Sequence, residues 1–138
     1  MKTITFLPKK EADLREQIIF GEMYNEDNYR FGIRRFNTLT VDKLELLIEH
    51  GFIKLSDRQN YAPEVHEIID FAHEHPGTEW IFEGYAVSIK RNDVRVSIDG
   101  FGSERAGGVN DVIDFLLMNR YADELSGGVN EELRCWYD

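Results

Sequence analysis

Cysteine is almost absent from this chain of 138 residues, in which Cys135 is the only one. A single thiol cannot form an intramolecular disulfide, which excludes the disulfide-rich scaffolds of small secreted proteins and favours a reducing compartment. Proline occurs only three times, and no apolar run approaches the roughly 20 residues of a transmembrane helix. We therefore expect a cytoplasmic location and no membrane partner.

Positive charge is also scarce. The chain has 16 Lys and Arg against 26 Asp and Glu, a formal net charge of -10, and residues 59–89 contain neither Lys nor Arg. Direct binding to nucleic acid phosphates needs clustered cations, so we expect no direct nucleic-acid partner. An acidic surface instead favours a basic protein partner, or serves only to keep the domain soluble.

The common catalytic and cofactor motifs are missing. No nucleophile elbow of the GxSxG type and no HExxH zinc motif occurs. The glycine-rich stretch 100–108 (GFGSERAGG) follows an expected strand and precedes an expected helix, but it matches neither phosphate-binding glycine pattern, so we interpret it as a flexible loop. We assign no catalytic residue and no cofactor, and we expect Cys135 to be a small buried hydrophobe.

The residues that are present describe a folded domain. Hydrophobic residues make up 42% of the chain, enough for a core in a single domain spanning residues 1–138. A β-hairpin is predicted over residues 84–99, because apolar residues recur at every second position on both sides of a polar turn at Arg91 and Asn92. This turn predicts a register that pairs Ile89 with Val94, Val87 with Val96, and Tyr85 with Ile98. We expect these pairs to face the core, and the small residues of the opposite face to be covered by a helix or free for a ligand or partner.

Three helices and three further strands complete the expected fold. Helices are predicted from the N-cap Thr40 to Gly51, from Pro63 to His75 and from Val109 to Tyr121. Strands are predicted over Lys2–Leu7, Tyr29–Phe36 and Glu132–Asp138, while Glu11–Met23 is ambiguous. This order predicts an α+β domain with a mainly antiparallel sheet packed by about three helices.

Carboxylates on two of these helices form the first candidate interaction surface. They are Glu64, Glu67, Asp70, Glu74, Asp111 and Asp114. We expect a non-enzymatic interaction module that binds or inhibits a basic, nucleic-acid-binding partner, in its sharpest form by mimicking nucleic acid. The alternative function of these carboxylates is solubility alone.

A second reading assigns the chain to small-molecule or anion binding, enzymatic or not, through Arg30, Arg34 and Arg95 on an arginine-lined hairpin face. His66 and His73, with Asp70 between them, have the spacing of a divalent metal site. No fourth ligand follows at a recognisable spacing, so no metal is assigned. The chain could be a monomer or a homodimer through the hairpin face or the 132–138 edge.

Four stretches carry a resemblance over roughly the last hundred residues. They are LTVDKLELLIEHGFI (residues 39–53), QNYAP (59–63), GYAVSIKRNDVRVSIDG (84–100) and LRCWYD (133–138). Together they resemble a group of short, acidic bacterial proteins of unassigned function associated with mobile elements of gut Firmicutes and Bacteroidetes. The resemblance implies no activity, cofactor or catalytic residue. It favours a role in conflict or transfer between genetic elements.

Overall fold

A five-stranded antiparallel sheet with helices against it forms the fold in the computed structural model, which describes residues 4–138. The strand order is β1-β2-β3-β5-β4. The strands are β1 (Ile33–Thr40), β2 (Ile81–Val87), β3 (Val96–Ser103), β4 (Glu124–Ser126) and β5 (Leu133–Trp136). The helices are α1 (Lys9–Phe20), α2 (Val41–Glu49), α3 (Val65–Glu74) and α4 (Val109–Met118), with a short 3-10 turn at Glu26–Asn28. The predicted α+β class and antiparallel sheet are confirmed, and the described residues hold four helices rather than about three.

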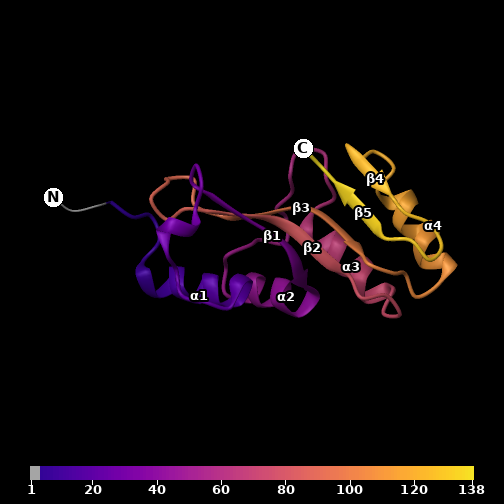
Figure 1. Cartoon of the computed structure of the whole chain (residues 1–138), viewed down its shortest axis with the longest axis horizontal. Coiled ribbons are helices and arrows are strands. Elements are labelled where there is room, and N and C mark those ends of the chain that lie inside the picture. The colour runs from indigo at the N-terminus through magenta and orange to yellow at the C-terminus, as the bar shows by residue number, and fades with distance from the viewer. Residues whose placement is uncertain (1–3) are drawn as a thin grey trace.

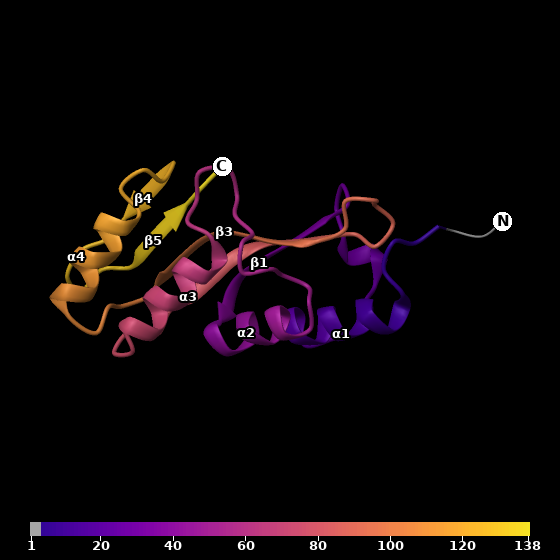
Figure 2. The same ribbon diagram turned by 180° about the vertical axis from the view of Figure 1, so that it is seen from behind.

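The helices lie unevenly around an elongated sheet. Figure 1 and Figure 2 show α1 and α2 along the same side of the long β1–β3 ribbon, with α3 further along that side. Helix α4 lies at the end of the molecule near β4 and β5, far from the N-terminal end. Among residues 4–138, no helix lies on the opposite side of the long ribbon. The sheet therefore has one covered face and one open face along β1–β3.

Local signals explain where the helices begin and end. Thr40 Oγ1 accepts a hydrogen bond from Lys43 N at 3.3 Å, which confirms the predicted N-cap of α2. Helix α3 begins two residues after the predicted Pro63, because the Glu67 carboxylate accepts the Glu64 N–H at 3.1 Å and closes the first turn there. Helix α1 resolves the ambiguous segment and ends at Gly21, whose φ of 74° is left-handed.

The predicted hairpin exists, but its predicted register is wrong. Gly84 pairs with Ile98, and Ala86 pairs with Val96, one residue away from the expected partners. Further along, Glu83 pairs with Gly100, so Asp99 is an extra residue on β3 between two consecutive partners on β2. This β-bulge resets the register, and alternation of apolar residues could not reveal it.

The predicted faces of the hairpin are reversed at Gly84, Tyr85 and Ala86 of β2, although Val87 and Ile89 are buried as expected. Gly84 and Ala86 lie on the covered face with Val96 and Ile98, whereas Tyr85 lies on the open face and is only half-buried. A Cβ on Gly84 would lie 3.0 Å from Cζ of Phe36, so the missing side chain leaves room for that ring. The small residues thus accommodate core side chains and are not a free docking strip.

Two strand predictions need correction at the sheet edges. Residues 4–7 do not form a strand, and the first part of the predicted Lys2–Leu7 strand lies outside the described residues. The predicted last strand is present as β5, but it lies between β3 and β4, so it is not the free edge that a dimer through residues 132–138 requires. The sequence pattern missed β4. The strand predicted over Tyr29–Phe36 is present as β1, which begins later, at Ile33, and ends at Thr40.

Aromatic rings dominate the core where α3 and α4 meet the sheet. Trp80 stacks on Phe115 of α4 with ring centroids 5.7 Å apart, and Phe101 of β3 packs edge-on against both Phe71 and Phe115. On α4, Val112 and Phe115 are buried, while Ile113 is exposed. None of the helices in the described part of the chain combines the length and the hydropathy needed to cross a membrane.

Candidate functional site

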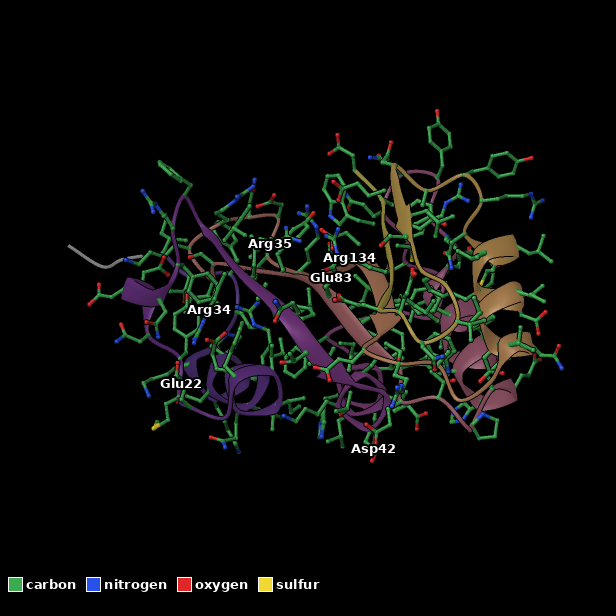
Figure 3. The ribbon with its side chains drawn as sticks, turned by 45° about the vertical axis from the view of Figure 1, so that its right-hand side comes forward. Glu22, Arg34, Arg35, Asp42, Glu83 and Arg134 are labelled. Carbon is green, nitrogen blue, oxygen red and sulfur yellow. The ribbon has the colours of Figure 1, made fainter. Side chains whose placement is uncertain are left out.

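Exposed carboxylates cover the outer surface of the helix layer. We call this the acidic surface, and it consists of the exposed Asp42 and Glu49 and the half-buried Glu45 on α2, with the exposed Glu67, Asp70 and Glu74 on α3. Figure 3 shows Asp42 on the helix side, away from the open face of the sheet. Within residues 4–138, four of these carboxylates take part in no ion pair: Asp42, Glu49, Asp70 and Glu74. The negative charge of these four residues is therefore uncompensated by a side-chain contact.

The six predicted acidic residues fall into two groups. Glu67, Asp70 and Glu74 are exposed on α3 as an interaction surface requires. Each of the others has a local partner: Glu64 contacts His66 at 2.8 Å, Asp111 accepts from Thr78 at 2.5 Å, and Asp114 contacts His75 at 2.8 Å. The contacts of Asp111 and Asp114 hold α4 to the segment between α3 and β2, whereas the contact between Glu64 and His66 lies within the start of α3.

The contact with Asp114 changes the pKa of His75. Its ring stacks on Phe71 with centroids 4.0 Å apart, and its Nε2 lies 2.8 Å from Asp114. Burial alone would lower the pKa of His75, but the hydrogen bonds to Asp114 and to the Phe71 carbonyl, with the charges of Asp111 and Asp114, raise the pKa above its usual value. The raised pKa favours the protonated ring, whose Nε2 donates to Asp114 and so links the end of α3 to α4.

The structure does not bring the predicted metal residues together. His66 contacts Glu64, and His73 contacts Glu45 of α2 at 2.6 Å. The carboxylates of Glu64 and Glu67 lie close to His66, but Glu67 caps the first turn of α3. Helix capping and a surface ion pair account for this trio, so we assign no metal to it.

The three predicted arginines are also separated. Arg34 lies on the covered face, where it contacts Glu16 at 2.9 Å and Glu22 at 2.6 Å. Figure 3 shows Arg34 and Glu22 on the helix side of the molecule. Arg95 lies at the other face, 3.0 Å from Asp93. Arg30 lies in the loop before β1, with its guanidinium over the Phe31 ring.

Two arginines that the sequence reasoning missed lie on the open face. Arg35 contacts the buried Asp99 carboxylate at 2.9 Å, and Arg134 contacts Glu83 at 2.9 Å and Glu124 at 2.8 Å. Figure 3 shows Arg35, Glu83 and Arg134 near one another, away from α1 and α2. Alternation along β1 was the available signal, since it places Arg35 on the face opposite Phe36.

A cleft of about 630 Å³ lies between the loop 51–60 and the beginning of β3. Lys54, Arg58 and Arg95 line it, against a single acidic residue, Asp57. The Asp57 carboxylate accepts the Lys54 main-chain N–H at 2.9 Å, so it has a structural role in the loop. The side chain of Asn60 donates to the main-chain oxygen of Asp138, so the C-terminal residue lies beside the cleft.

A smaller cavity of about 110 Å³ adjoins this cleft and reaches the buried Arg15 of α1. The two cavities share five lining residues: Gly51, Phe52, Val94, Arg95 and Val96. Arg15 is 1% exposed and donates from Nη2 to Tyr29 Oη at 2.9 Å, while its Nε and Nη1 have no partner among residues 4–138. The pKa of Tyr29 is raised by burial, so its hydroxyl stays protonated and does not neutralise Arg15.

Cys135 is not available as a nucleophile. It is fully buried on β5, as expected, and burial raises the pKa of its thiol to about 12. The reactive thiolate is therefore scarcely populated at neutral pH.

Comparison with known proteins identifies no relative: the chain matches no protein family, no curated protein and no solved structure.

Proposed function

We propose that this protein is a non-enzymatic interaction module whose acidic surface binds a basic, nucleic-acid-binding protein and inhibits it. The observation that carries the proposal is the outer surface of α3. Asp70 and Glu74 are exposed there without an ion-pair partner among the described residues, on a helix that contains no Lys or Arg.

Helix α2, next to α3, adds further negative charge to the acidic surface. Asp42 and Glu49 of α2 are exposed and likewise unpaired in the described part of the chain, and α2 contributes only Lys43 as a cation. Uncompensated carboxylates on adjacent helices produce a negative potential that accelerates the approach of a basic surface. The same carboxylates repel an acidic surface and so disfavour binding to an acidic protein.

The setting of the function is part of the proposal. A cytoplasmic location agrees with a buried, unpaired Cys135. The resemblance to proteins of mobile elements suggests that the partner acts on DNA or RNA and that its inhibition serves conflict or transfer between genetic elements. The carboxylates would then occupy the positions that phosphates take in the partner's groove.

Affinity capture with matched charge variants tests the proposal. The tagged protein would be incubated with a nuclease-treated bacterial lysate at about 50 mM and about 500 mM NaCl, because salt screens exposed charges over these concentrations. We expect a basic protein to be retained at low salt only and to be released by added double-stranded DNA. The Asp70→Lys/Glu74→Lys variant should not retain this protein.

The control variant is Glu131→Lys/Glu132→Lys, which makes the same change in net charge in the turn before β5. It should retain the partner. If both variants lose it equally, net charge alone is responsible and the assignment to α3 is wrong. If nothing is retained, or DNA does not compete, the protein is not an inhibitor of a nucleic-acid-binding partner.

A further inference from the structure

We infer that the cleft between the loop 51–60 and β3 binds a small organic anion carrying a carboxylate or phosphate group, with Arg58 and Arg95 at its rim and Arg15 in the smaller cavity that adjoins it. This site is separate from the acidic surface and does not depend on the function proposed for it. Its residues also differ from the predicted arginine set, with which it shares only Arg95.

The charge of the cleft is opposite to that of the molecule. Its lining contributes three cations and one carboxylate, in a chain whose formal net charge is -10. Among the described residues, Lys54 and Arg58 have no ion-pair partner, and Arg95 shares Asp93 with Arg91. A concave surface lined by one sign of charge attracts the opposite sign, so a small anion is the ligand class that fits.

The buried guanidinium of Arg15 is the second, independent observation. A buried cation is costly unless acceptors surround it, and two of the three nitrogens of this group lack one. Glu16, the nearest carboxylate, lies 3.7 Å from Nη2 and accepts hydrogen bonds from Tyr29 and Arg34. An anionic oxygen in the adjoining cavity of about 110 Å³ would supply the missing acceptor.

The edge of β3 adds a main-chain donor to the same place. Val87 N donates to Arg95 O at 2.8 Å, so alternation in the antiparallel pair turns the Val96 N–H away from β2. On that side β5 pairs with β3 only from Gly100 onward. The volume of about 630 Å³ lies within the range of ordinary small-molecule sites.

Titration of the ¹⁵N-labelled protein with three probes tests the site: inorganic phosphate, succinate and adenosine monophosphate. We expect saturable shifts of the amide signals of residues 51–60 and 94–98, and of the Arg15 Nε–H signal, with at least one probe. Saturation by phosphate or the nucleotide alone would identify a phosphate ligand, and saturation by succinate alone a carboxylate ligand.

Rim variants keep the test independent of folding. Arg58→Gln and Arg95→Gln should each weaken binding about tenfold, the loss of one charge-assisted hydrogen bond. Arg120→Gln removes an exposed arginine at the end of α4, remote from the cleft, and should leave the affinity unchanged. The inference is overturned if no probe saturates up to about 10 mM, or if Arg120→Gln weakens binding as much as the rim variants.

Discussion

Asp99 joins three strands of the sheet through a single residue. Its carboxylate accepts a hydrogen bond from Arg35 of β1 at 2.9 Å, and its carbonyl accepts one from Tyr137 N, just after β5, at 2.7 Å. Because it is the extra residue of the bulge, it also lets Ile98 and Phe101 both face the core. One polar residue thereby fixes the register of β3 against its neighbours.

His75 makes folding stability depend on pH at the residue scale. Its pKa is raised in the folded protein, so its contribution to stability is present below about pH 6.5, the usual value, and is lost as the pH rises through the folded-state pKa. We expect the Asp114→Asn variant to lower the pKa of His75 and to reduce this loss.

An NMR titration of the His75 ring, with urea unfolding at several pH values, measures both quantities. A His75 midpoint at or below 6.5 in the wild-type protein would show that burial outweighs the contacts with Asp114 and the Phe71 carbonyl. An unchanged midpoint in Asp114→Asn would remove that carboxylate from the explanation.

Strand β2 depends on the absence of a side chain at Gly84. A Cβ at this position would lie 1.9 Å from the Ser97 carbonyl oxygen, a main-chain atom that cannot move without disturbing β3. We expect Gly84→Ala to lower the free energy of unfolding by about 2 kcal/mol or more, because it forces the two strands apart.

Urea denaturation of Gly84→Ala beside Gly77→Ala measures the effect. Gly77 lies in the turn before β2, and a Cβ there would meet nothing within 4 Å. If the two variants unfold at the same urea concentration, the close approach of Gly84 to β3 does not contribute to stability.

The elements differ in how far the sequence could predict them. Helix α2 was predictable because Thr40 supplies a local cap and Leu44 and Leu47 form its buried stripe. Helix α1 was ambiguous because its buried face includes Arg15 and Glu16, so the hydrophobic pattern of a surface helix is interrupted by charge.

The candidate sites also differ in how far the sequence could predict them. The exposed carboxylates of α3 follow directly from helical periodicity, so Glu67, Asp70 and Glu74 could be predicted. The cleft could not, because its cations come from the loop 51–60 and from β3, and only the tertiary fold brings these segments together. The burial of Arg15 beside them depends on that same packing.

Charge is distributed unevenly over the whole molecule, and this affects stability. The helix layer carries unpaired carboxylates, while the open face carries Arg35 and Arg134 in ion pairs with Asp99, Glu83 and Glu124. With a net charge of -10, repulsion among the carboxylates should exceed the attraction within these pairs. We expect the free energy of unfolding to rise with salt, by on the order of 1 kcal/mol between about 20 mM and 500 mM NaCl.

Urea is the suitable denaturant for this measurement, since guanidinium is itself a salt. The Asp70→Lys/Glu74→Lys variant should gain less from added salt than the wild-type protein, because it removes part of the repulsion. A free energy of unfolding that falls with salt would show that the ion pairs of the open face dominate.

The contact between Asn60 and Asp138 has a practical consequence for labelling the protein. Asn60 lines the cleft, so a fluorophore or affinity tag attached after Asp138 would sit at the cleft mouth and obstruct a ligand there. The N-terminal segment is no better placed, because Leu7 lines the smaller cavity that adjoins the cleft. A reporter on α4, which lies at the far end of the molecule from the N-terminus in Figure 1, leaves the entrance clear, whereas one attached after Asp138 blocks it.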